Sequence, residues 1–475
     1  MEDIFIGDAS SNKSISETSS HRFENGGSIL HESNEYAKYL VKFLNLTIES
    51  LPRKLAKSVG LWDGNRFVLE LSGSFLRDAW AILWRYGMNY FQLSARIQGV
   101  AEQFTQIYRH QSDGRSYEGP IQLLDALGLH TLTQSSFRAW INDTVSDPLI
   151  LNELAVASTR VNYGQSLDGV NGLAGGVGLI PMTDPRLWAV KEGNQRIVEG
   201  LLKYHKVKVL KDHQVIKITK LPSESTSTKG TTYKVHSSTH DSADIVTNSF
   251  DLIVFALPGR DLVEIEFELD GEKMSSPSTT PASIPPVHDS TTSSPSIPMP
   301  PVPSFQVTHT TWIVGRLRAE PFHLKKQKDI PGSILTTESP SQEFTSITAY
   351  EEDDVTHHRT YKVFSRHPFT STLVDKYFTD VDPSATHRTS WNAYPKYSPP
   401  ESFAHSFRLF TDFDPTSQLW HPPALEHAAS CIEMQLVSSR NTAIRIADMW
   451  KTNSKETQTP DHLHPSHHQH LKREL

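Results

Sequence analysis

The chain has 475 residues, of which 37% are hydrophobic, and its formal net charge is −8. With 9 Trp, 14 Tyr and 21 Phe it is too aromatic to be wholly disordered, so the composition predicts a globular protein with disordered inserts. The acidic balance and the absence of a Lys/Arg-rich run exclude nucleic acid as the main partner. The single cysteine, Cys431, excludes an intrachain disulfide and says nothing about the redox compartment.

The N-terminal region carries no targeting pattern. The first 35 residues lack a basic stretch followed by an apolar one, and no apolar run of about 18 residues occurs, so the sequence as written predicts neither a signal peptide nor a transmembrane segment. Sequons at Asn12, Asn45 and Asn142 agree with a secretory route, although such triplets are frequent by chance. The final Lys472–Leu475 is similar to an endoplasmic-reticulum retrieval tetrapeptide.

The first informative segment is Phe23–His31, FENGGSILH. Two adjacent glycines let the backbone approach a planar or phosphorylated ligand, because no Cβ intervenes. A purely structural turn into a strand is the alternative. Further along, apolar residues at helical spacing predict amphipathic helices over Ser74–Tyr86 and Phe91–Tyr108.

In each of the next three segments, the residues are compatible with a ligand site and also with ordinary structure. Arg160–Ser166 (RVNYGQS) and Gly175–Leu179 (GGVGL) either line a pocket or turn the chain. Leu187–Leu202 predicts a strand, a Gly-Asn turn and a helix, an arrangement that directs backbone N–H groups at an anion or carbonyl. An ordinary glycine-containing helix start is the alternative.

The second half alternates strands with polar segments. Strands are expected over Lys206–Thr219, Tyr233–His236 and Asp251–Leu257, the last as a buried strand. Small residues lead into a long helix over Ala424–Ala447, whose first turns present a positive dipole end or simply join the core. The fold class is therefore mixed α/β, with a helix-rich lobe inserted into a sheet-containing lobe.

Polar, low-complexity segments are expected to lie outside the packed core. The tail contains the histidine run HLHPSHHQH, to which no metal is assigned because a flexible tract lacks fixed geometry. Residues 1–20 are expected to be disordered or displaced. The other expected loops, insert and tail are Ser223–Gly230, Glu351–His358, 275–304 and 452–475.

Taken in order, these segments resemble the prenylcysteine oxidase (prenylcysteine lyase) family. The resemblance extends from about Phe23 to Trp450. The matching stretches are FENGGSILHESNEYAKYL, LWRYG, IYRHQSDGRSY, RVNYGQS, LWAVKEGNQRIVEGLL, WNAYPKYSPPE and ALEHAASCIEMQLVSSRNTAIRIADMW.

The resemblance implies an FAD-dependent thioether oxidase that uses O₂ to split S-prenylcysteine, with farnesyl or geranylgeranyl chains, into cysteine, a prenyl aldehyde and H₂O₂. It implies the fold of FAD-linked amine oxidases, with an interrupted Rossmann-type FAD domain and a helix-rich substrate domain, over residues 21–451. A lysosomal, vacuolar or secretory location is implied as well. The expected FAD-side pieces are 21–35, 187–265 and 405–451, and the substrate-side pieces are 36–186 and 305–404.

The resemblance also implies site residues by position, but no catalytic side chain, since hydride removal from a carbon next to sulfur needs no base. Those expected at the flavin and its ribityl chain are Glu24, Gly26, Gly27, Ser28 and His31. Those expected at the isoalloxazine and adenine are Trp188, Gly193, Asn194 and Val215. Those expected to contact the flavin from the late helix are Glu426, Ala428, Ala429 and Glu433. Candidates for the substrate pocket are Tyr163, Gln165, Trp84 and Tyr394.

The sequence departs from the family at its start. The family opens with a strand, a G-x-G-x-x-G turn and a helix that hold the FAD pyrophosphate, and this chain shows none of them. The first βαβ unit is therefore expected to be missing, and the chain as written to be poorly soluble or flavin-free. A non-catalytic prenyl-lipid-binding relative and a related FAD amine oxidase are the alternative functions.

Overall fold

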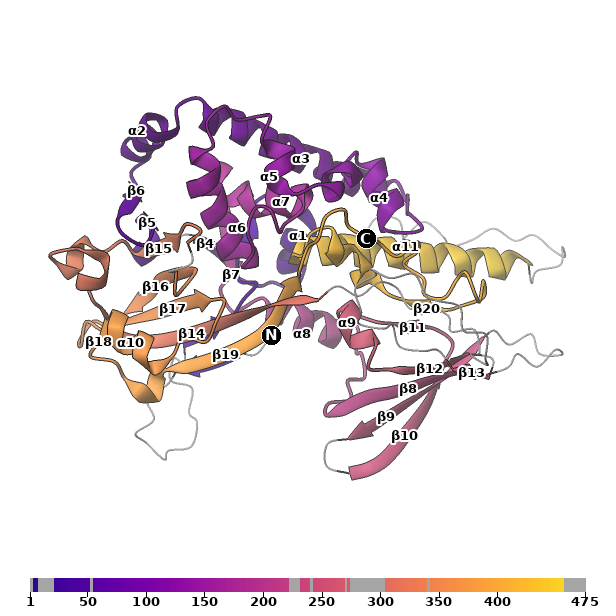
Figure 1. The fold of residues 1–475 in the computed structure, drawn as a ribbon. Coiled ribbons are helices and arrows are strands. Elements are labelled where there is room, and N and C mark those ends of the chain that lie inside the picture. Colours follow the sequence, from indigo (N-terminus) through magenta and orange to yellow (C-terminus); the bar gives the residue numbers. More distant parts are fainter. Residues whose placement is uncertain are drawn as a thin grey trace, which may run out of the picture.

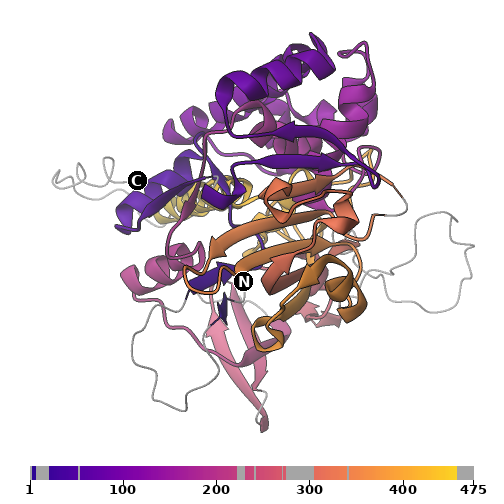
Figure 2. The same cartoon turned by 90° about the vertical axis from the view of Figure 1, so that its left-hand side faces the viewer.

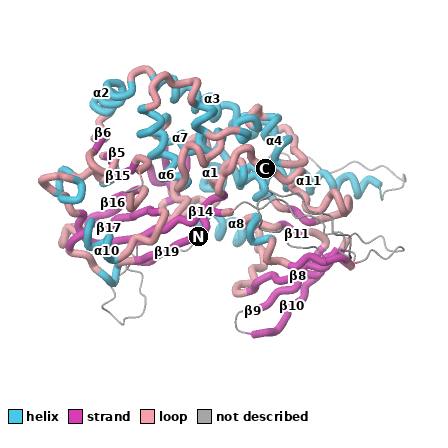
Figure 3. Tube along the Cα trace, viewed as in Figure 1, coloured by secondary structure: helices cyan, strands magenta, loops and turns pink. Residues whose placement is uncertain are grey.

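The computed structural model describes residues 3–6, 21–51, 54–221, 231–239, 242–269, 271–273, 304–339 and 342–456. The polar segment 275–304, apart from Ser304, and the end of the tail lie outside the described residues, as does the whole of the expected loop 223–230. Many of the helices gather in one lobe, and the two largest sheets lie below it (Figures 1 and 3). No described helix is both long and apolar enough to cross a membrane.

The larger sheet has eight strands in the order β18-β14-β17-β16-β15-β5-β6, with β19 paired to β14. All neighbours are antiparallel except β5 and β15, which run parallel. Its apolar side buries Trp62, Ile313, Phe344 and Phe369 beneath helix α10 (Ser371–Tyr377). The strands are β5 (Val59–Trp62), β6 (Phe67–Leu71), β14 (Phe305–Leu317), β15 (Ser333–Thr336), β16 (Ser346–Glu352), β17 (Arg359–Ser365), β18 (Phe378–Thr379) and β19 (His387–Pro395). The turn between β16 and β17 confirms the loop expected near Glu351–His358.

The helical lobe is inserted between β6 and β7, as expected, and its two predicted helices are present as α2 and α3. The segment GGVGL forms neither a turn nor a pocket wall but the middle of α7, because its glycines allow helices to approach closely. A Cβ on Gly175 would lie 2.2 Å from the ring of Phe137. The α-helices are α2 (Phe75–Tyr86), α3 (Asn89–Ser112), α4 (Pro120–Ala126), α5 (Phe137–Ile141), α6 (Val156–Tyr163) and α7 (Gly172–Thr183). Short helical turns elsewhere are η1 (Lys54–Ala56), η2 (His130–Gln134), η3 (Leu151–Ala155), η4 (Glu320–Phe322), η5 (Gln327–Asp329) and η6 (Pro383–Ala385).

A small central unit joins segments from both ends of the chain. Its three strands lie in the order β3-β7-β4, and α1, α8 and the long α11 pack against them. The apolar residues of this cluster include Leu30, Trp188, Ile197 and, from the start of α11, Ile432. The elements are β3 (Leu30–His31), α1 (Glu35–Phe43), β4 (Ile48–Leu51), β7 (Leu187–Val190), α8 (Gln195–Tyr204), η7 (Pro422–His427) and α11 (Ile432–Glu456). The predicted late helix is thus two elements, and α11 extends into the segment expected to be tail.

The second sheet, seen at the lower right of Figure 1, has five strands in the order β10-β9-β8-β12-β13. The strand expected from Lys206 begins only at His213, because Lys206 and Asp212 adopt positive φ angles of 52° and 61° and turn the chain. The five strands are β8 (His213–Leu221), β9 (Thr232–Thr239), β10 (Ser242–Phe250), β12 (Glu266–Leu269) and β13 (Glu272–Lys273), and α9 (Gly259–Leu262) precedes β12.

One further expectation about strands was wrong. The buried strand expected over Asp251–Leu257 is only β11 (Ile253–Val254), because its parallel partner β20 (Leu419–Trp420) offers just two residues for pairing. At the N-terminus, within the segment expected to be disordered or displaced, β1 (Asp3–Ile6) occupies the edge of β2 (His21–Glu24) in an antiparallel pair.

Viewed along the perpendicular direction in Figure 2, the helical lobe covers one side of the molecule and the larger sheet lies beneath it. The segments singled out in the sequence meet where the lobe, the sheet and the central unit come together.

Candidate active site

The Gly-Gly segment follows β2 and is held by the larger sheet. The carbonyl of Asn25 accepts a hydrogen bond from Thr310 Oγ1 (3.1 Å), and its Oδ1 accepts one from Trp312 Nε1 (3.1 Å). Gly26 packs so closely on Trp391 that an added Cβ would lie 2.7 Å from the indole Cζ2. Gly27 has a positive φ of 62°, and no atom lies within 4 Å of where its Cβ would be. The backbone therefore leaves an open face at Gly27.

The Gly-Asn turn lies directly against this segment. The carboxylate of Glu24 accepts a hydrogen bond from the backbone N–H of Asn194 (2.7 Å), and Asn194 Nδ2 donates to the carbonyl of Gly27 (2.6 Å). Gly193 makes the turn with φ of 92°. Asn194 is 2% exposed, and its Oδ1 has no hydrogen-bond donor among the described residues. A buried acceptor without a donor is costly, so this oxygen is a natural contact for a ligand N–H or O–H.

A buried lysine, which the sequence analysis did not identify, supports the same segment. Lys362 of β17 donates from Nζ to the carbonyl of Glu24 (2.6 Å). Its ammonium lies 5.3 Å from the ring centroid of Trp312 and 4.6 Å from that of Phe364. A cation over aromatic faces is stabilised by the ring quadrupoles. A lysine within the apolar run Tyr361–Phe364 was the available indication.

His31 and Trp188 lie on the paired strands β3 and β7, which follow the Gly-Gly segment and precede the Gly-Asn turn. Trp188 Nε1 donates to the carbonyl of His31 (3.0 Å), and both residues are inside the central unit. His31 Nε2 lies 3.3 Å from Asp184 Oδ2, and its Nδ1 is 2.7 Å from Ser33 Oγ. Burial lowers the pKa of His31, an effect that the Asp184 carboxylate partly offsets. These contacts fix His31 against the end of α7. Ser28 is half-buried on the loop between Gly27 and β3.

The late helix meets the site through α1. Glu433 accepts hydrogen bonds from the backbone N–H groups of Tyr36 (2.8 Å) and Ala37 (3.0 Å) and from Tyr108 Oη (2.8 Å). Its carboxylate is thus used to cap the N-terminus of α1. Burial raises the pKa of Glu433, while the donated hydrogen bonds lower it in part.

The remaining predicted residues of this region are buried or distant. Ala428 and Ala429 are fully buried, and the carbonyl of Ala428 accepts a hydrogen bond from Asn171 Nδ2 (3.2 Å). Glu426 accepts one from Ser430 Oγ (2.9 Å), and burial raises its pKa. Val215 lies on β8, in the second sheet, where it pairs with Ser237.

An aromatic cluster lies where α6, β19 and the start of α11 meet. The ring of Tyr163 packs edge-on against Tyr394 (centroids 5.1 Å apart) and Tyr397 (5.6 Å). Gln165 fixes the chain after β19, because its Nε2 donates to the carbonyl of Pro395 (2.9 Å) and its Oε1 accepts from the N–H of Tyr397 (3.1 Å). Burial raises the pKa of Tyr394 to about 12, so the phenol is neutral.

The structure brings Tyr163, Gln165 and Tyr394 together but not Trp84. Trp84 lies on α2, is 79% exposed and stacks on Trp80 at a centroid distance of 5.5 Å. Trp84, a substrate-pocket candidate from the family resemblance, belongs to an exposed apolar face of α2 and does not line the buried aromatic cluster.

A cavity of about 590 Å³ opens beside this cluster. Arg160, the first residue of RVNYGQS, reaches into it from α6 and forms an ion pair with Glu338 (2.9 Å), which also binds Arg366. The sequence analysis assigned no role to these three residues, since only the fold brings them together. A second, much smaller space of about 20 Å³ shares Arg160 and Arg366 with the cavity and is also lined by Trp391 and Tyr394.

Comparison with known proteins identifies first the class and then the family. Among solved structures, cyclohexylamine oxidase from Brevibacterium oxydans has a TM-score of 0.50 at 13% identity, covering 90% of this chain and 88% of the other. A fatty acid isomerase from P. acnes that produces CLA has a TM-score of 0.51 at 12% identity, covering 91% and 88%. Such likeness shows the fold alone, and it confirms the expected α/β fold of the amine-oxidase type.

The sequence matches are more specific. A profile of the prenylcysteine lyase family matches residues 69–283 and 287–459. Farnesylcysteine lyase of Arabidopsis thaliana is 31% identical over 449 residues, covering 90% of this chain and 78% of the relative. Prenylcysteine oxidase 1 of Bos taurus is 28% identical over 469 residues, covering 91% and 80%. The chain therefore belongs to the prenylcysteine lyase family.

Proposed function

We propose that this protein is an FAD-dependent oxidase that cleaves S-prenylcysteine at the thioether. Overall, the thioether, O₂ and water give cysteine, a prenyl aldehyde and H₂O₂. One observation carries the proposal: Glu24 and Gly27 are joined by direct hydrogen bonds to Asn194, beside an open glycine face and an acceptor that has no donor in the part of the chain that the structure describes. Membership of the family and the names of its relatives support the substrate class.

The residues present fit the ring end of a flavin. Gly27 offers backbone without a side chain, as a planar ligand requires, and Asn194 Oδ1 can accept from a flavin N–H or a ribityl hydroxyl. Glu24, Gly193 and Lys362 would hold this loop in place rather than touch the ring. Trp391 continues the wall from Gly26 toward Tyr394.

A bound flavin supplies the two-electron chemistry, accepting a hydride and passing the electrons to O₂. The protein contributes position and environment. Tyr394, which is partly exposed and packs on the buried Tyr163, presents aromatic surface for the isoprenoid chain, whose burial stabilises binding by about 0.8 kcal/mol per CH₂. Burial raises the pKa of Tyr163, Tyr394 and Tyr397, so these phenols bring no negative charge to the carbon next to sulfur, where positive charge develops.

The test is product analysis with purified, FAD-supplemented protein. S-farnesylcysteine is expected to yield peroxide, farnesal and cysteine in equal amounts, and a polyamine is expected to yield no peroxide. Peroxide from the polyamine alone would favour a related amine oxidase. Saturable binding of S-farnesylcysteine with no product would indicate a prenyl-lipid-binding protein instead.

A further inference from the structure

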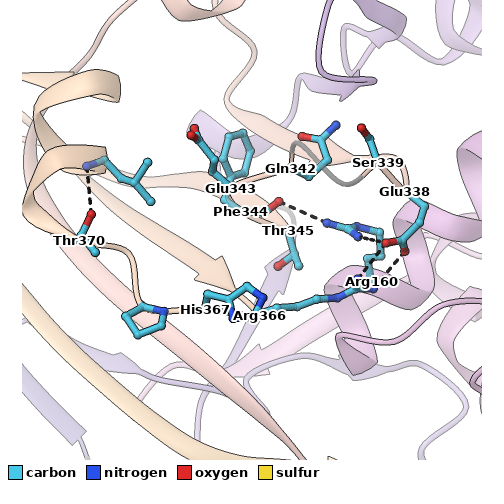
Figure 4. A pocket seen from close by; sticks show the side chains of 12 residues that line it. Arg160, Glu338, Ser339, Gln342, Glu343, Phe344, Thr345, Arg366, His367 and Thr370 are labelled. Carbon is cyan, nitrogen blue, oxygen red and sulfur yellow. Dashed lines mark hydrogen bonds and ion pairs between the residues drawn. The ribbon is translucent and has the colours of Figure 1, made fainter.

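The cavity beside the aromatic cluster has a composition unlike an ordinary gap between elements. It is bounded by α6, by the β15-β16 connection and by the segment that runs from β17 into α10. Figure 4 shows the side chains of Arg160 and Arg366 reaching Glu338 at one end, with Thr370 at the opposite end. The other residues that line it are Ser339, Gln342, Glu343, Phe344, Thr345, His367, Pro368 and Leu373.

Positive charge exceeds negative charge at the Arg160 end. Arg160 is 2% exposed, and its Nη1 lies 2.9 Å from Glu338 Oε1. Arg366 holds the same carboxylate with both terminal nitrogens, at 2.8 and 3.0 Å. Two guanidinium groups thus share one carboxylate. The other carboxylate in the cavity, Glu343, is bound by Lys376 Nζ (2.6 Å) and Tyr377 Oη (2.8 Å).

The pKa shifts and an unused donor agree with a missing anion. Burial lowers the pKa of Arg160, the charge of Arg366 lowers it further, and Glu338 offsets this only in part. A second anion beside Arg160 would stabilise its charged form. Gln342 Nε2 also lines the cavity and has no acceptor among the described residues.

Arg160, Thr345 and Arg366 also line a second, much smaller space of about 20 Å³, whose wall includes Trp391 and Tyr394. Trp391 in turn contacts Gly26. A ligand whose carboxylate meets the two arginines therefore lies next to residues of the aromatic cluster and of the Gly-Gly segment.

We propose that Arg366 and Arg160, with Gln342, bind the α-carboxylate of S-prenylcysteine, so that the enzyme selects the free amino acid over its carboxyl ester. This inference rests on the proposed function and names how its substrate is held. Guanidinium groups bind carboxylates in a bidentate, charge-assisted manner. The carboxylate is only a few bonds from the prenyl carbon that reacts, so fixing it also fixes that carbon.

The experiment compares S-farnesylcysteine with its methyl ester. Dissociation constants are measured by calorimetry under anaerobic conditions, and KM and kcat by peroxide release. The wild type is expected to bind the acid about ten- to a hundredfold more tightly than the ester, as loss of a charged hydrogen-bond partner predicts. Arg366→Gln is expected to remove this preference, because it weakens binding of the acid and leaves binding of the ester unchanged. The effect on KM should be larger than the effect on kcat.

The matched control is Arg359→Gln. Arg359 lies on β17 and also pairs with a glutamate, since its Nε is 2.7 Å from Glu352, but it does not line the cavity. This variant should keep the preference for the acid. Because Arg366 Nε also donates to the carbonyl of Gly164 (2.7 Å), its variant is checked by thermal unfolding. Gln342→Leu provides a second test that spares both ion pairs, and it should raise the KM of the acid only.

Equal affinity of the wild type for acid and ester, with both compounds cleaved, would overturn the inference and leave the proposed function standing. If Arg366→Gln weakened the binding of acid and ester equally, the inference would also be overturned, because loss of a purely structural ion pair would affect both ligands alike. Preferential binding of the acid without any product from either compound would support the carboxylate site and refute the oxidase.

Discussion

Gly26 shows how one absent methyl group positions an aromatic wall of the site. A Cβ there would lie 2.7 Å from the indole of Trp391, so the ring or the loop must shift. We expect Gly26→Ala to lower the free energy of unfolding by about 1–3 kcal/mol, the usual range for overpacking, and to weaken FAD binding. Gly99→Ala is the control, because no atom lies within 4 Å of its Cβ position in α3, and it should be neutral or stabilising. Denaturant unfolding and flavin-fluorescence titration of both variants check this, and equal effects would contradict it.

Glu401 makes stability depend on pH. It accepts hydrogen bonds from Asn171 Nδ2 (3.3 Å) and the N–H of Ser398 (2.9 Å), yet burial raises its pKa from 4.5 to about 7. Between pH 4.5 and about pH 7 the unfolded chain loses the Glu401 proton and the folded chain keeps it. The contribution of Glu401 to the free energy of unfolding is therefore complete below pH 4.5 and decreases until about pH 7. Relative to Glu401→Gln, we expect the free energy of unfolding of the wild type to decrease by up to about 3 kcal/mol across this range.

The measurement is the unfolding midpoint in denaturant at pH 5 and pH 8. Glu199→Gln, which changes a carboxylate on the surface of α8, serves as the matched control. A difference between wild type and Glu401→Gln that stays constant over this range would show that the carboxyl group titrates normally.

Several site residues could be predicted from the sequence because they belong to short motifs with a recognisable local pattern. The glycines at 26, 27 and 193 and the amide of Asn194 stand in segments whose local pattern predicts a turn, and the structure joins them. Lys362 could not be placed in this way, because a single buried lysine is meaningful only once its strand and the rings around it are known. The FAD contacts themselves stay a prediction for every residue named.

At the scale of elements, α1 and α11 depend on each other through Glu433. Replacing it by alanine would leave the buried N–H of Ala37 and the N–H of Tyr36 without their acceptor. We expect Glu433→Ala to lower the free energy of unfolding by about 2–4 kcal/mol and to increase amide exchange in α1 before other helices. Hydrogen exchange with peptide resolution measures this. Protection of α1 at wild-type levels would show that the cap contributes little.

Periodicity predicted helices better than it predicted which face they bury. The spacing in Ser74–Tyr86 and Phe91–Tyr108 gave α2 and α3, but α2 exposes Phe75, Leu76 and Trp84. Strands were harder, because a strand requires a partner that may be distant in sequence. Lys206–Thr219 is shortened by two residues with positive φ, and β11 by a partner only two residues long.

At the scale of the whole molecule, the fold places three distant parts of the chain around one cluster. Leu30 and Trp188 come from strands that pair, and Ile432 from the start of α11 packs beside them. The order of motifs along the sequence was enough to identify the family and its fold. The ion-pair cavity could not be predicted in this way, since Arg160, Glu338 and Arg366 lie on separate elements of the helical lobe and the sheet.

The central claim is that the Gly-Gly and Gly-Asn segments together hold a flavin ring, and FAD titration followed by fluorescence quenching tests it most directly. In contrast to the flavin-free chain expected from the sequence, the account predicts saturable quenching for the wild type, at least about tenfold weaker binding for Asn194→Ala, which removes the buried acceptor, and unchanged binding for Asn65→Ala in the exposed β5-β6 turn. Equal FAD affinity in the wild type and Asn194→Ala, with both proteins folded, would contradict it.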